Sequence, residues 1–119
     1  MDGEELREYC LAKPGAWVDQ PWEGDDVAKV GKKIFAFLGD STVGVKAGAT
    51  REEADEWLAR YPDAASTMPY IGRQGWNTLR LDGQIPDDEI VEAVDASYDM
   101  VVARLPTKDR PTGWRPVER

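Results

Sequence analysis

The stretch that decides the fold is residues 27–47, VAKVGKKIFAFLGDSTVGVKA. Residues 27–30 and 33–38 are rich in β-branched and aromatic side chains, and the glycine between them tolerates the positive φ of a tight turn. These two runs predict a β-hairpin. In residues 42–47, valine and alanine alternate with polar or small residues, which predicts a third antiparallel strand with one solvated face. The sequence therefore predicts a three-stranded meander.

Helical patterns flank this meander on both sides. Residues 4–12 have the spacing of a short amphipathic helix. Thr50, followed three positions later by Glu53, is a capping box at the start of a second helix. The longest predicted helix begins after Pro86 and places five apolar side chains on one buried stripe: Ile90, Val94, Tyr98, Val101 and Leu105.

Two further segments are less regular. Residues 16–26 contain Trp17, Pro21 and Trp22, which favours a loop or an edge segment packed down by its tryptophans. Tyr70-Ile71 and residues 76–81 predict a second hairpin. The expected order is then helix, three strands, helix, two strands, helix (α-β-β-β-α-β-β-α). This order predicts an α+β domain whose antiparallel sheet carries its helices on one side.

Length and composition limit the classes of protein that fit this sequence. The 119 residues suit one domain, which we place at residues 1–105, followed by an extended basic tail at 106–119 in which Trp114 is able to dock back. With no histidine and only Cys10, zinc sites, histidine-dependent catalysis and an intramolecular disulfide are excluded. We expect no metal, no cofactor, no enzymatic activity, no membrane span and a cytoplasmic location.

The two faces of the predicted sheet differ in character. If the leucines at 79 and 81 face the helices, the open face carries an aromatic and basic set that includes Trp76, Arg80 and Lys46. The strand at 33–38 is apolar at both parities, so Phe35 and Phe37 are also candidates for that open face.

Several strings, in this order along the chain, resemble the MmcQ/YjbR family of small bacterial proteins over about residues 4–110. They are Leu6-Arg7-Glu8-Tyr9-Cys10-Leu11 with Pro14-Gly15-Ala16, the hairpin Lys29 to Ala36, Trp76 to Gly83, Pro86-Asp87-Asp88-Glu89, and Ser97-Tyr98 with Val101 to Pro106. The loop Tyr70 to Gly75 departs from the family, because many members carry histidine, lysine and arginine there.

The resemblance implies a fold compared in shape to a double-wing DNA-binding domain, and with it DNA as a partner. Phosphate contacts would then come from Lys32, Lys33, Lys46, Arg73, Arg80 and the basic tail, with Trp76 stacking on a base. The net charge of −8, from 15 basic and 23 acidic residues, works against such binding unless these cations form a concentrated patch.

Two alternatives use the same open face differently. The first is a protein-interaction or homodimeric module that buries the apolar surface around Phe35, Phe37 and Trp76. The second is a pocket for a small planar molecule, such as a drug, between Trp22 and Trp76. The acidic net charge favours the protein-interaction alternative over DNA, whereas the family resemblance favours DNA.

Overall fold

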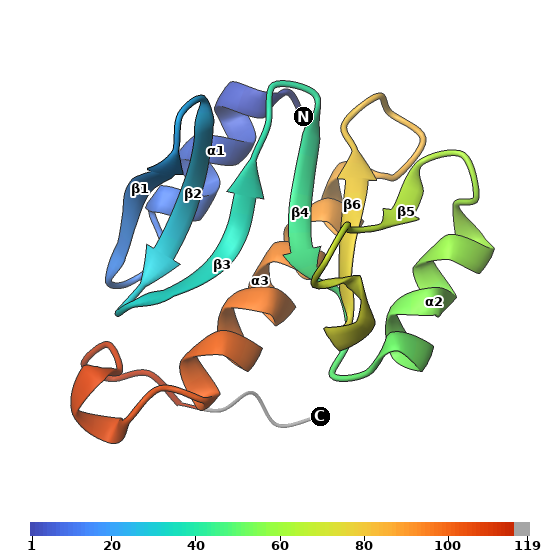
Figure 1. Ribbon diagram of the computed structural model, residues 1–119. Helices are drawn as coiled ribbons and strands as arrows, with labels where there is room; N and C mark the ends of the chain where they lie inside the picture. The colour runs from blue at the N-terminus through green and yellow to red at the C-terminus, as the bar shows by residue number, and fades with distance from the viewer. Residues whose placement is uncertain (116–119) are drawn as a thin grey trace.

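The predicted meander forms the centre of a six-stranded antiparallel sheet, in strand order β1-β2-β3-β4-β6-β5, in the computed structural model of residues 1–115 (Figure 1). The elements in chain order are α1 (Gly3–Leu11), β1 (Ala16–Trp22), β2 (Asp25–Val30), β3 (Lys33–Leu38), β4 (Thr42–Lys46), α2 (Arg51–Arg60), β5 (Ala65–Thr67), the 3-10 helix η1 (Gly72–Gln74), β6 (Trp76–Arg80), α3 (Asp87–Ala103) and the 3-10 helix η2 (Thr107–Asp109). The α+β class and the predicted order of helices and strands are confirmed, with β1 as an additional edge strand.

The helices begin where their caps predict. Thr50 accepts a hydrogen bond from the backbone N–H of Glu53 at 3.2 Å, while the Glu53 carboxylate accepts from the N–H of Ala49 at 2.8 Å. The first bond satisfies a backbone donor that the start of a helix leaves without a partner. The second ties the residue before the cap to the first turn of α2. Pro86 precedes α3, whose first turn holds three acidic residues at the positive end of the helix dipole.

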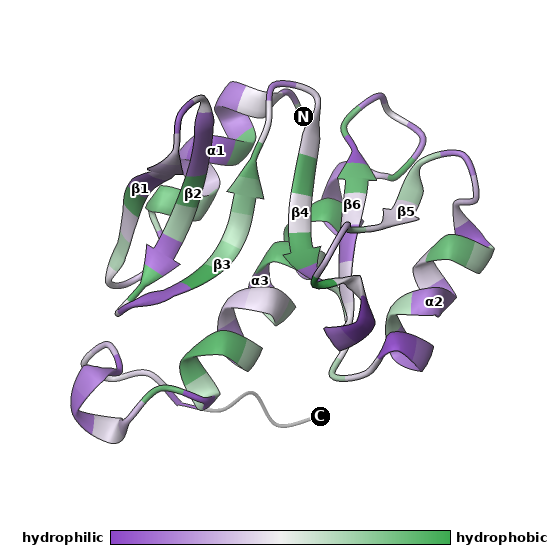
Figure 2. Cartoon of the chain, in the orientation of Figure 1, coloured by the Kyte–Doolittle hydropathy of each residue, from purple (hydrophilic) through white to green (hydrophobic). Residues whose placement is uncertain are grey.

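All three helices pack on the same face of the sheet. The five-residue stripe predicted for the third helix is buried, and α3 contacts β2, β3 and β4. Asn77 of β6, on the same face, donates from Nδ2 to the Ala54 carbonyl of α2 at 2.8 Å. Figure 2 shows hydrophobic positions, in green, on β3, β4, β6 and α3, where these elements enclose the core. Within residues 1–115, no α-helix packs on the opposite face of the sheet.

A β-bulge in β3 decides which phenylalanine faces the core. Ala36 pairs with Ala28 and Ile34 pairs with Lys29, so Phe35 is an extra residue without a partner on β2. Phe35 is fully buried against Tyr98 of α3, at 5.2 Å between ring centroids, whereas Phe37 lies on the open face. The expectation that both rings share the open face is therefore wrong for Phe35.

The sheet edges also differ from the sequence prediction. Residues 16–22 form an edge strand, β1, which is one of the two predicted alternatives and pairs with β2 with an irregularity between Asp19 and Trp22. Its tryptophans are exposed, so the prediction that they pack the segment down is wrong. Tyr70-Ile71 is not a strand, and the partner of β6 is instead β5, with Ser66 opposite Thr78. A three-residue edge strand of small and polar side chains forms through pairing with β6, which its own sequence does not signal.

Residues 106–115 lie against the domain, while the rest of the predicted tail, residues 116–119, is outside the described part of the chain. Arg110 donates to the carbonyls of Leu105 and Ala103, and the Trp114 indole N–H donates to Asp99 at 3.1 Å. The docking of Trp114 that the sequence permitted is thus present.

Candidate binding groove on the open face of the sheet

The helix-free face of the sheet is hollowed into a groove whose floor is fixed by strand register. Phe37 of β3 pairs with Gly44 of β4, which pairs with Thr78 of β6, so these three residues point to the same side. Phe37 packs edge-on against Trp76, with ring centroids 5.6 Å apart. We call this hollow, together with its walls, the open-face groove.

The two walls stand on the same face of the sheet, near its opposite edges. One wall is the cross-strand pair of Trp22 on β1 and Asp25 on β2. The other is the segment Met68 to Ile71, which follows edge strand β5. The apolar part of the groove encloses about 640 Å³, within the range of small-molecule sites.

Glycine at position 44 makes room for the second wall. A Cβ at this position would lie 2.8 Å from the sulfur of Met68 and 3.1 Å from the Cβ of Phe37. Because glycine has no side chain, Met68 can lie directly on β4, and the wall approaches the floor closely.

Tyr70 stands at the rim in an unusual backbone conformation. Its side chain is 100% exposed, and its φ of +66° is the only positive φ of a non-glycine residue among residues 1–115. The N–H of Ile71 donates to the Pro69 carbonyl at 2.7 Å, which closes a three-residue γ-turn of the rarer, strained kind around Tyr70. Because Tyr70 is fully exposed, burial of its ring does not explain why the backbone adopts this strained conformation.

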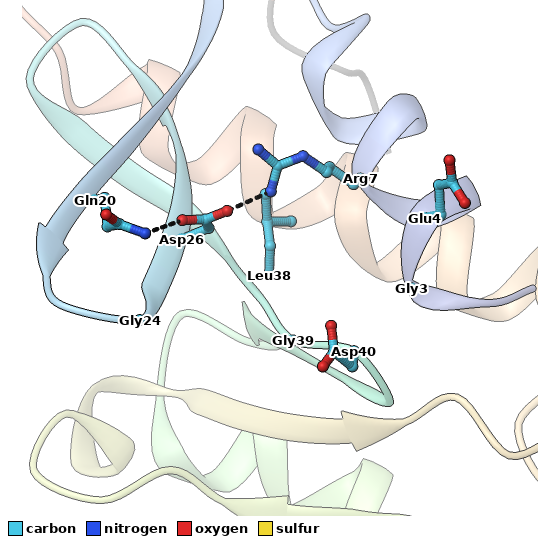
Figure 3. A pocket seen from close by; sticks show the side chains of 9 residues that line it. All are labelled: Gly3, Glu4, Arg7, Gln20, Gly24, Asp26, Leu38, Gly39 and Asp40. Atoms are coloured by element: carbon cyan, nitrogen blue, oxygen red, sulfur yellow. Dashed lines mark hydrogen bonds and ion pairs between the residues drawn. The ribbon is translucent and has the colours of Figure 1, made fainter.

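The groove continues past Leu38 and Gly39 into a polar pocket of about 300 Å³ beside α1, shown in Figure 3. Asp26 accepts a hydrogen bond from Arg7 at 2.6 Å and one from Gln20 at 2.9 Å. The Arg7 guanidinium is the main cause of the lowered pKa of Asp26. Asp26 is therefore ionised at neutral pH and is already paired with a cation.

The residues predicted to contact DNA do not form one exposed patch, although Lys46 and Trp76 are cross-strand partners. Lys32 and Lys33 are exposed at the β2–β3 turn, and Arg73 is exposed on η1, on the other side of the same end of the sheet (Figure 1). Arg80 is at the opposite end of β6, in an ion pair with Asp82 at 3.3 Å.

Two of the predicted contact residues are buried. Lys46 is 8% exposed and donates from Nζ to the Gln74 carbonyl at 3.1 Å, and burial lowers its pKa. Trp76 is also 8% exposed, because Phe37 and its neighbours cover it. Neither side chain offers the accessible surface that a phosphate or a base contact needs.

Sequence reasoning identified Trp22 and Phe37 as binding candidates but missed Met68 and Tyr70. The proline at 69 was the available signal, since it disfavours a regular strand at 70–71. No group of His, Cys, Asp and Glu side chains within residues 1–115 is arranged to hold a metal ion. In the same part of the chain, no helix has both the length and the apolarity of a membrane span.

An α+β domain with one antiparallel sheet, its helices on one face and a groove on the other, is the class of protein that this geometry defines. The family model described as YjbR matches residues 11–100, and the chain belongs to the YjbR family. It is 34% identical over 116 residues to the uncharacterized protein YjbR of Escherichia coli strain K12, covering 92% of this chain and 95% of that protein.

Two solved structures share the fold. One is a Deinococcus radiodurans protein with a DUF419 domain, at a TM-score of 0.79 and 19% identity, covering 98% of this chain and 94% of that one. The other is a Pseudomonas syringae protein, at a TM-score of 0.68 and 18% identity, covering 84% and 98% of the two chains.

Proposed function

We propose that this protein is a non-enzymatic binding module that takes a small planar, largely apolar molecule in the open-face groove. The observation that carries the proposal is the fully exposed Tyr70, held in a strained turn on the wall opposite the exposed Trp22. Strained conformations persist where the surrounding structure enforces them, and they concentrate at functional sites. Two exposed rings above an aromatic floor are well suited to stacking on a planar ligand.

The chemistry of the lining supports binding rather than catalysis. Asp25, on one wall, and Tyr70, on the other, are the ionisable side chains among the residues that line the apolar part of the groove. The neighbouring Asp26 is paired with Arg7. A lowered pKa keeps Asp26 ionised, so it is poorly suited to exchange protons near neutral pH.

The test is a titration with Nile red, a planar neutral dye whose emission rises in apolar surroundings. Trp22→Ala should weaken binding about tenfold, because one stacking surface is lost. Trp17→Ala is the matched control, since Trp17 lies on the same strand, is 44% exposed and does not line the groove. Equal effects of the two substitutions, or no binding by the unmodified protein, would contradict the proposal.

DNA binding is a second candidate, which the β2–β3 turn supports. Lys32 and Lys33 are exposed at its tip and form no ion pair with any other residue of the described chain. Anisotropy of labelled DNA between about 50 and 200 mM salt tests this candidate, since phosphate contacts weaken with ionic strength. Reversing both charges should abolish the salt-dependent binding, and an unchanged salt slope would exclude this surface.

A further inference from the structure

We propose that the open-face groove selects planar aromatic cations, with the positive charge of the ligand beside Asp25; this inference rests on the proposed function and specifies its ligand class. The groove has an apolar side, formed by Phe37, Met68 and Ile71, which accommodates the rings. At its other side the lining includes Asp25 and Asp26, and the residues that line this part of the groove include no lysine or arginine.

The two carboxylates are not equivalent. Asp26 points to the helix side of the sheet, where Arg7 pairs with it at 2.6 Å. Asp25 is exposed, lies on the open face and has no ion-pair partner within residues 1–115. The unneutralised negative charge of the groove is therefore that of Asp25.

The same two strands hold a complete example of the arrangement that we propose. Lys29 places its Nζ 5.3 Å from the ring centroid of Trp17 and 2.6 Å from the Asp19 carboxylate. A cation is thus held between an indole and a carboxylate on the open face. Trp22 and Asp25 are a cross-strand pair next to the β1–β2 turn. They provide an indole and a carboxylate of the same kind, without a cation.

Lys29 does not neutralise the groove itself. Its ammonium is engaged by Asp19 and Trp17, and it lies four residues along β2 from Asp25, about 13 Å at the usual rise of a strand. A ligand with its own positive charge would complete the Trp22–Asp25 pair, whereas an anionic ligand would face an uncompensated carboxylate.

The experiment titrates the full chain with three bicyclic probes of similar shape: N-methylquinolinium, which is cationic, naphthalenemethanol, which is neutral, and naphthoate, which is anionic. Binding is followed by NMR at the indole N–H of Trp22. The cation should bind about fivefold more tightly than the neutral probe, and the anion should bind most weakly. In Asp25→Asn the cation should lose this advantage, while the affinity of the neutral probe stays the same.

Asp88→Asn is the matched control, because Asp88 is exposed in the first turn of α3, which packs on the opposite face of the sheet. It removes the same charge from the protein and should change none of the three affinities. Equal affinity for cation and neutral probe, or equal effects of Asp25→Asn and Asp88→Asn, would overturn the charge selectivity while leaving the groove function standing. Absence of binding by all three probes would overturn the proposed function as well.

Discussion

Phe35 and Phe37 are two positions apart on β3, yet they point to opposite faces of the sheet. The bulge at Phe35 reverses the alternation of side chains between them. Phe35 is held edge-on by Tyr98 in the core, and Phe37 is held edge-on by Trp76 beneath the groove. The bulge thus lets one strand supply both a core aromatic, Phe35, and a floor residue of the groove, Phe37.

This division predicts different costs for truncating the two rings. Phe35→Ala should lower the free energy of unfolding by about 3–5 kcal/mol, because it leaves a cavity in the closed core. Phe37→Ala should lower it by about 1–2 kcal/mol, since this ring is only half-buried. Urea denaturation measures both values, and equal costs would contradict the assignment of the two rings to different faces.

Tyr70→Gly should separate stability from binding. Glycine adopts a positive φ without the steric cost that tyrosine pays, and the exposed Tyr70 ring loses no packing when it is removed. The free energy of unfolding should stay the same or rise by up to about 1 kcal/mol, while the affinity for Nile red falls. A clear loss of stability would mean that the ring supports the fold rather than a ligand.

Gly44→Ala should narrow the groove from beneath. The new methyl group would lie 2.8 Å from the sulfur of Met68, so the wall at Met68 must shift. Overpacking of this kind costs about 1–3 kcal/mol, and the flexible methionine places the cost near the lower end. Dye titration and urea denaturation on the same sample should show weaker binding in a protein that still folds.

Cys10 should be unreactive in the folded protein. Burial is the largest cause that raises the pKa of its thiol to about 12, so almost no thiolate forms at neutral pH. The unfolded chain has the lower thiol pKa. Ionisation of the thiol therefore favours the unfolded chain. The stability of the fold should not depend on Cys10 ionisation below the unfolded pKa, and it should fall as the pH rises from there through about 12. Labelling with a thiol reagent at pH 8 should track global unfolding, and rapid labelling of native protein would contradict the burial.

The sequence predicted the helices and the central meander because their signals are local. Thr50 and Pro86 mark helix starts by capping and by proline geometry, and the stripe from Ile90 to Leu105 follows the helical period. These features do not depend on which segments meet later in space. The residue ranges of β3 and β6 agree with the prediction to within one residue.

The features that were missed depend on tertiary pairing. Residues 34–38 are apolar at both parities, so no pattern reveals that Phe35 is the bulged residue. β5 consists of Ala65, Ser66 and Thr67, which form a strand only because β6 is alongside. The turn at Tyr70 has no glycine to mark its positive φ. The groove is built from these features, which explains why the sequence indicated Trp22 but neither Tyr70 nor Met68.

The scattered basic residues illustrate a second limit of sequence reading. Lys46 of β4 pairs with Trp76 at one end of β6, whereas Arg80, at the other end of β6, pairs with Thr42. Lys46 and Arg80 are therefore separated by the length of a strand. Charge counts along a sequence do not predict such separation, because register determines which ends of the strands meet.

The most direct measurement of the central claim is an NMR titration of isotope-labelled protein with naphthalenemethanol, observing the indole N–H signals of its five tryptophans. The groove account predicts that the signal of Trp22 moves most and saturates, while those of Trp17, Trp57 and Trp114 stay in place. Unchanged signals at all five, or an equal response at Trp17 and Trp22, would contradict a ligand site in the open-face groove.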